Sequence, residues 1–137
     1  MVSVLDNNED LLRYLYADLT RISTVSSPDI ILHRFDDSSS LVRGVVAVQE
    51  WEEGLIASTG GSMKMDVESV TANAHFGTVM GMIRAKGIRP GHKDLSVPFC
   101  GLWRFVDGKA VEHWETIAGD PGTIAKWVKE LDNGSEA

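Results

Sequence analysis

The stretch GLWRFVDGKAVEHWE, residues 101–115, constrains the fold more than any other part of the chain. Its two arms are rich in aromatic and β-branched residues, as strands are. Asp107-Gly108 between them is a strong signal for a tight hairpin turn. We therefore expect an antiparallel hairpin, with one face that closes a core and another that lines a pocket.

The rest of the chain alternates between helical and strand patterns. Asn7 and Asn8 provide polar caps for a first helix with apolar residues at helical spacing. Helices that are segregated from a run of antiparallel strands indicate the α+β class. The predicted elements are a helix over residues 9–22, a strand over 29–35, a helix over 45–57, strands over 63–72, 76–88, 95–106 and 109–117, and a last helix that begins at Asp120-Pro121.

Composition bounds the class of protein. With 137 residues, 43% of them hydrophobic and 24% charged, we expect residues 1–137 to form a single domain. The lone Cys100 excludes a disulfide within the chain, and its apolar neighbours predict a buried thiol. A net charge of −7 with scattered Lys and Arg argues against a nucleic-acid partner. We find no membrane-length apolar run and no signal peptide, so we expect a cytoplasmic protein without a membrane partner.

The element order and the hairpin together resemble the nuclear-transport-factor-2-like superfamily, and within it the SnoaL-like polyketide cyclase group. The residues that carry the resemblance are Arg43-Gly44 before the second helix and, above all, WRFVDGKAVEHWE at 103–115. The resemblance implies a cone-like fold, a curved antiparallel sheet wrapped around N-terminal helices, often dimeric and with a deep apolar pocket. The superfamily contains isomerases, cyclases, epoxide hydrolases and dehydratases, and also members without catalysis, so the fold alone leaves the function open.

Alternation along the second arm of the hairpin assigns its side chains to two faces. In SnoaL-like cyclases the acid that ends this strand is the general acid/base, and the resemblance gives Glu115 that role. His113 then lies in or under the same pocket, whereas Trp114 turns to the opposite face, where a partner in a homodimer could cover it. By simple alternation, one face carries Val111, His113, Glu115 and Ile117, and the other carries Ala110, Glu112 and Trp114.

The register across the turn decides which residues of the first arm face the pocket. A plain two-residue turn pairs Cys100 with Glu115, whereas a bulged turn places Phe99 or Gly101 on the pocket face. We favour the bulged turn, which directs Arg104 outward and the rings of Phe99, Trp103 and Phe105 inward. The residues expected to contact a ligand are Trp103, Phe99, Trp51 and Ile117.

Ketosteroid isomerase, a more distant relative, resembles the chain at further places. Its helix-borne tyrosine falls on Tyr14. Its base lies at the end of the first strand, where His33, Asp36 and Asp37 are candidates and the apolar setting of His33 favours that residue. Its protonated aspartate falls on Gly101, which has no side-chain donor, so the oxyanion pair of the steroid isomerase is incomplete here.

These residues predict a cofactor-free acid/base enzyme that acts on a small apolar metabolite, such as a natural-product intermediate. Glu115 moves a proton, His113 or His33 is the second acid/base, and Tyr14 polarises an oxygen; isomerisation, aldol-type cyclisation and epoxide opening all remain open. The alternatives are a non-catalytic ligand-binding or dimerisation domain and a protein-interaction adapter. The four histidines show no metal-ligand spacing, so we predict no metal site.

Overall fold

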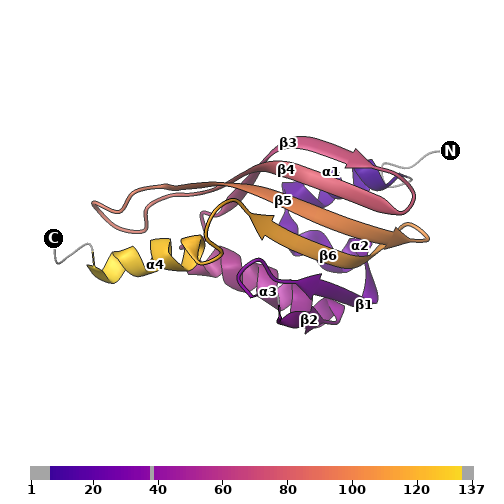
Figure 1. The fold of residues 1–137 in the computed structure, drawn as a ribbon, viewed down its shortest axis with the longest axis horizontal. Helices are drawn as coiled ribbons and strands as arrows, with labels where there is room; N and C mark the ends of the chain where they lie inside the picture. Colours follow the sequence, from indigo (N-terminus) through magenta and orange to yellow (C-terminus); the bar gives the residue numbers. More distant parts are fainter. Residues whose placement is uncertain (1–6, 38, 134–137) are drawn as a thin grey trace.

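The computed structural model describes residues 7–37 and 39–133, which form helices and one curved sheet (Figure 1). The first six residues, on which the prediction of no signal peptide partly rests, lie outside this range. The helical elements are α1 (Asn8–Ala17), the short 3₁₀ helix η1 (Leu19–Arg21), α2 (Ile22–Val25), α3 (Val45–Ser58) and α4 (Thr123–Asn133). The strands are β1 (Ser26–His33), β2 (Leu41–Arg43), β3 (Lys64–Ala72), β4 (Phe76–Ala85), β5 (Leu95–Val106) and β6 (Lys109–Ile117).

The described strands form a six-stranded sheet in the order β2-β1-β6-β5-β4-β3. Neighbouring strands are antiparallel except for β1 and β6, which run parallel. The expected α+β class is confirmed, but the sheet is mixed and not wholly antiparallel. The parallel pair arises because the chain leaves β1, forms β2, α3 and then the β3–β6 meander, and returns to β1 in the same direction. Helix α1 packs against β3 and β4, and α3 packs against β1.

The first helix is shorter than the pattern predicts. Asn7 caps α1 as expected, because its side chain accepts a hydrogen bond from the backbone N–H of Asp10. The helix ends at Ala17, where the next residue, Asp18, has extended backbone geometry. The Asp18 carboxylate accepts from the backbone N–H of Thr20 and starts the 3₁₀ helix instead. A local bond from a side chain to the backbone thus outcompetes helix propagation.

The two strands that precede α3 differ from the expectation. Strand β1 begins at Ser26 and ends at His33, earlier than the predicted 29–35, and its pairing with β6 is irregular between Ser26 and Ile31. Pro28 lies in this irregular part and has no N–H to donate. Strand β2 was not predicted. It precedes Gly44, whose φ of 89° lets the chain turn into α3.

The hairpin register confirms the bulged alternative. Gly101 lies opposite Glu115, and the pairing shifts between Arg104 and Phe105. The shift turns Ala110 into the core, where it is fully buried, and leaves Val111 half-buried; simple alternation assigned these two residues to the wrong faces. Cys100 is half-buried rather than buried. The rings of Phe99, Trp103 and Phe105 are buried as predicted.

The C-terminal helix α4 is attached to the loop between β4 and β5. The indole N–H of Trp127 donates to the carbonyl of Lys93 at 2.7 Å, and the ring of His92 packs on that indole with centroids 4.3 Å apart. His92 is therefore a structural contact and not a free side chain in solvent. None of the helices in residues 7–37 and 39–133 combines the length and apolar character needed to cross a membrane.

Candidate active site

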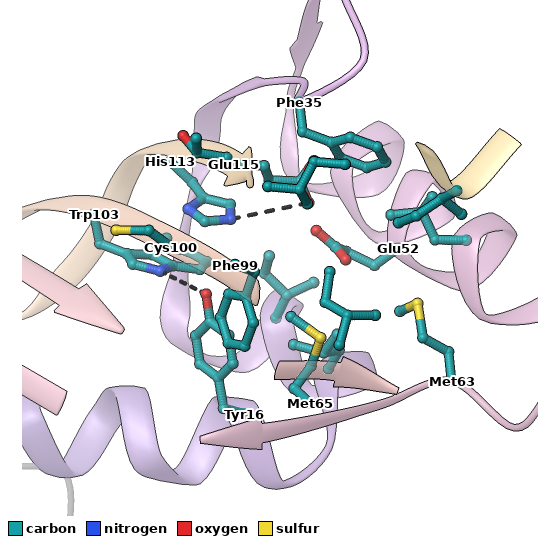
Figure 2. Close-up of a pocket in the computed structure, with 18 residues that line it drawn as sticks. Tyr16, Phe35, Glu52, Met63, Met65, Phe99, Cys100, Trp103, His113 and Glu115 are labelled. Carbon is teal, nitrogen blue, oxygen red and sulfur yellow. Dashed lines mark hydrogen bonds and ion pairs between the residues drawn. The ribbon is translucent and has the colours of Figure 1, made fainter. Parts of the chain in front are cut away.

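A cavity lies between helices α1 and α3 and the inner face of the β5–β6 hairpin (Figure 2). The space free of atoms, its open mouth included, is about 510 Å³, but the centre of a water molecule fits in only about 40 Å³ of it, so the cavity is narrow. Most of the wall is apolar. The polar side chains in the wall include those of Tyr16, Glu52, His113 and Glu115.

Glu115 ends β6 with its carboxylate in this cavity, as predicted. The indole N–H of Trp51 on α3 donates to Glu115 Oε1 at 3.0 Å, and the backbone N–H of Phe35 donates to the same carboxylate. Burial raises the pKa of Glu115, although the hydrogen bonds from Glu52, Trp51 and Phe35 act in the opposite direction. Glu115 is therefore a stronger base than an exposed glutamate.

Glu52 is a second buried carboxyl group that the sequence analysis missed. It lies on α3 with a residue exposure of 4%, and one of its carboxyl oxygens lies within 4.8 Å of one of Glu115. Burial, and then the negative charge of Glu115, raise the pKa of Glu52 well above its ordinary value. A signal was present in the sequence: Glu52 follows the buried Val48 by four residues and therefore shares its helix face.

His113 lies beside Glu115 on the same face of β6. Its Nδ1–H donates to the carbonyl of Leu102 at 3.1 Å, and its ring stacks on Trp103 with centroids 3.6 Å apart. Burial lowers the pKa of His113 to about 3, so the ring is neutral at physiological pH. Because the proton is on Nδ1, Nε2 carries a free lone pair. The Nε2 atom lies 4.0 Å from Glu115 Oε2 (Figure 2).

Tyr16, and not Tyr14, brings a hydroxyl group to the cavity. Trp103 Nε1–H donates to Tyr16 Oη at 3.0 Å, and a side-chain Cβ at Gly101 would lie only 2.5 Å from that oxygen. The glycine thus makes room for the tyrosine hydroxyl. Gly101 has no polar side chain, but the hydroxyl group of Tyr16 from α1 occupies the space beside it. Burial raises the pKa of Tyr16.

Two predicted catalytic residues lie away from the cavity. Tyr14 is two residues before Tyr16 on α1, and the guanidinium of Arg21 stacks on its ring at 4.3 Å. His33 points to the outer face of the sheet, where its Nε2 lies 2.6 Å from Glu112 Oε2 and its ring stacks on Trp114. The reason is alternation along β1: Leu32 is buried on the inner side, so His33 faces outward.

The predicted ligand contacts are placed as follows. Phe99, Trp103 and Ile117 line the cavity, whereas Trp51 supports it by holding Glu115. Three side chains of the cavity are of kinds that can bind a metal ion, namely Glu52, His113 and Glu115. One oxygen or nitrogen atom from each lies within 4.8 Å of the other two. Histidine spacing could not reveal this set, because only one of its members is a histidine. That no metal is bound stays a prediction.

Comparison with known families identifies the chain. The model of the SnoaL-like domain matches residues 13–113, which begin within α1 and include most of the β5–β6 hairpin. The chain belongs to the SnoaL-like family. The predicted resemblance to this group and to the nuclear-transport-factor-2-like superfamily is thereby confirmed. No functionally curated protein sequence matches this SnoaL-like chain significantly.

Solved structures agree on the fold of this SnoaL-like domain. A protein of unknown function with a cystatin-like fold from Xanthomonas campestris is 19% identical, with a TM-score of 0.72 over 88% of this chain and 98% of that chain. Bal32a from a soil-derived mobile gene cassette is 18% identical, with a TM-score of 0.72 over 93% and 98%. TerC, co-crystallised with polyporic acid, is 16% identical, with a TM-score of 0.69 over 93% and 99%. At such identities the likeness concerns the fold.

Proposed function

We propose that this SnoaL-like protein is a cofactor-free enzyme that binds a small, uncharged, largely apolar metabolite and moves a proton on it with Glu115. The observation that carries the proposal is the carboxylate of Glu115, whose side chain is only 13% exposed and lies in an aromatic-walled cavity beside the neutral ring of His113. A desolvated carboxylate with a raised pKa is suited to general base catalysis near neutral pH.

The charge of the cavity supports an uncharged ligand. Among the described lining residues there is no Lys or Arg, so a carboxylate or phosphate group would meet two acids and no counter-charge. The remaining wall is aliphatic, aromatic and thioether, and Met63 and Met65 are flexible enough to move aside for a ligand in this narrow space. A flat natural-product intermediate meets these conditions, and TerC, a structural relative, was crystallised with polyporic acid.

Each polar group has a role that its hydrogen bonds support. Glu115 takes or gives the proton. Tyr16 is a hydrogen-bond donor to the substrate oxygen, because Trp103 already donates to its oxygen and its own proton remains for the ligand. His113 offers a lone pair on Nε2. Tyr16 therefore replaces Tyr14 in the predicted set, and His33 has no role in it.

These roles suit proton transfer next to a carbonyl group, as in isomerisation and aldol-type cyclisation. Epoxide opening with an acid-arginine-acid set is less favoured, because Arg104 faces outward and is paired with Glu112. One positioned acid/base group accelerates a reaction by about 10²–10⁴-fold. Such a contribution is enough for a substrate that is already activated.

A flat, uncharged probe tests the proposal without knowledge of the natural substrate. 5-Nitrobenzisoxazole loses its ring C–H proton to a base while its N–O bond breaks, which gives a nitrile and a phenolate. We expect the protein to accelerate this elimination and Glu115→Gln to lose about 100-fold or more of the rate. Glu112→Gln, on the outer face of the same strand, is the matched control and should retain the parental rate.

The competing function is a binding domain without catalysis. It would bind the probe, detected by quenching of tryptophan fluorescence, with no acceleration of the elimination. Parental turnover in Glu115→Gln would remove Glu115 from the mechanism and leave only the family and the fold.

We also propose that the protein is a homodimer that uses the outer face of the sheet. Phe76 and Met80 on β4 are each 47% exposed, and Trp114 on β6 is half-buried on the same face. Trp114→Ala should weaken the dimer, measured by sedimentation over a range of concentrations. A parent protein that sediments as a monomer would contradict this part of the proposal.

A further inference from the structure

The cavity contains two buried carboxyl groups, Glu52 and Glu115, and no Lys or Arg among the described residues that line it. One carboxyl oxygen from each of Glu52 and Glu115 and one ring nitrogen of His113 all lie within 4.8 Å of one another. Arg34 interacts electrostatically with Glu115, but its guanidinium is held by Asp36 through bonds of 2.8 and 2.7 Å and stacks on Trp51. Buried charges in proteins are ordinarily paired, so this arrangement needs an explanation.

A single proton between the two groups explains it. Two carboxylates this close and this buried cannot both be ionised, since each charge raises the energy of the other in a poorly solvated site. The proton makes one of them a donor and leaves the other as the acceptor. The titratable groups that face the pair are His113 on β6, Tyr16 on α1, and Arg34 and Asp36 after β1.

The contacts of the two carboxyls decide which one carries the proton. Glu115 accepts from Trp51 Nε1–H and from the backbone N–H of Phe35, and both donors stabilise its anion. Among the described residues no N–H donor lowers the pKa of Glu52, which is also the more deeply buried of the two. The anion therefore belongs on Glu115 and the proton on Glu52.

We propose that Glu52 is a positioning residue that stays protonated and donates a hydrogen bond to Glu115, so that the pair carries one negative charge, directed at the substrate. The catalytic part of this inference rests on the proposed function, because it gives Glu52 a role through Glu115. Trp51 supports the same arrangement from the other side of the Glu115 carboxylate. The pair thus keeps Glu115 ionised in a site that would otherwise favour its neutral form.

The first test detects the proton on Glu52 by the pH dependence of protein stability, and it needs no substrate. A carboxyl that is protonated only in the folded state binds more protons there, so stability falls as pH rises above the unfolded value of about 4.3. Between about pH 5 and about pH 8 the parent should lose several degrees of Tm relative to Glu52→Gln. Glu50→Gln, exposed on the same helix, is the control and should follow the parent. A parent and a Glu52→Gln variant with parallel pH profiles would overturn the proposal.

The second test compares two replacements of Glu52 with 5-nitrobenzisoxazole as the probe. Glu52→Gln keeps an N–H that can donate to Glu115 and should retain most of the rate. Glu52→Leu has similar size and no donor, so its rate should fall about tenfold at neutral pH and the midpoint of its pH profile should move to higher pH. Equal rates and equal midpoints for the two variants would overturn the role of Glu52.

The two tests separate this inference from the proposed function. If the parent does not turn over the probe but loses stability with pH as described, the shared proton stands and the catalytic proposal fails. If the parent turns over the probe with the help of Glu115 and the stability profiles are parallel, the catalytic proposal stands and the shared proton fails.

Discussion

The β6 strand places an acid on each face of the sheet, and the two acids differ in their partners. On the outer face, Glu112 lies 2.6 Å from His33 and accepts from Arg104 at 3.1 Å. On the inner face, Glu115 accepts from the neutral indole of Trp51, and no Lys or Arg lines the cavity among the described residues. The exposures of the two side chains are similar, 18% for Glu112 and 13% for Glu115.

The pKa values of the two acids are therefore shifted in opposite directions. Burial raises the pKa of both, but hydrogen bonds from His33 and Arg104 outweigh burial at Glu112 and lower its pKa. Glu115 also lies deeper in the molecule, inside the cavity, so its burial and its lack of a lining Lys or Arg both favour a raised pKa. The outer acid contributes to stability, whereas the raised pKa of the inner acid reflects a cost in stability, a pattern that is common at functional sites.

The largest difference between the two faces should appear at their tryptophans. Trp103 is 1% exposed, stacks on His113 and donates to Tyr16, so Trp103→Ala should cost about 3–5 kcal/mol in the free energy of unfolding. Trp114→Ala removes a half-buried ring that stacks on His33 and should cost much less. Urea unfolding of both variants measures the difference. Equal losses would contradict the view that the inner face carries the core.

A smaller effect is expected at Gly101. A Cβ there would lie 2.5 Å from Tyr16 Oη, so Gly101→Ala should displace the hydroxyl and cost about 1–3 kcal/mol in stability, with a loss of activity on the probe. Gly54, inside α3, has no atom within 4 Å of the corresponding position. Gly54→Ala is the matched control and should raise stability by about 0.5–1 kcal/mol. A Gly101→Ala variant with parental stability and activity would show that Tyr16 does not need this space.

A third effect, smaller again, concerns the outer acid and its pH dependence. Because the pKa of Glu112 is lowered on folding, its contribution to stability is present above the unfolded value of about 4.3 and is lost as pH falls through the lower folded value. Glu112→Gln should lower stability at neutral pH by about 1 kcal/mol or less, since the group is partly open to solvent. Thermal unfolding of parent and variant should converge in acid. A deficit that persists in acid would mean that packing, and not charge, is lost.

The smallest effect is expected on removal of metal ions. If Glu52 and Glu115 share a proton and the site holds no metal ion, dialysis against a chelator should leave Tm and the rate with 5-nitrobenzisoxazole unchanged. Elemental analysis of the purified protein checks the same point. A stoichiometric divalent metal that is lost together with Tm would show that these three residues are ligands instead.

Helix faces explain why the sequence favoured Tyr14 over Tyr16 and gave no prediction for Glu52. Tyr14 and Tyr16 are both in the first helix, but only Tyr16 shares the buried face of Leu12, four residues earlier. Matching a distant relative by position selected Tyr14, whereas the spacing to Leu12 favours Tyr16. Glu52 is missed for a similar reason, because an acid on an apolar helix face is easily taken for a solvated one. In both cases the periodicity of the helix contained the signal.

The sequence by itself determined the α+β class, the family, the hairpin around Asp107-Gly108 and the inward direction of Glu115. The hairpin and the direction of Glu115 depend on local turn chemistry and two-residue alternation, the α+β class on the order of the elements, and the family on the resemblance carried by residues 103–115. Only the tertiary structure decided that Glu52 meets Glu115 and that Tyr16 fills the space at Gly101. These contacts join α1, α3 and the hairpin, whose relative placement depends on packing across the whole core and not on any one segment.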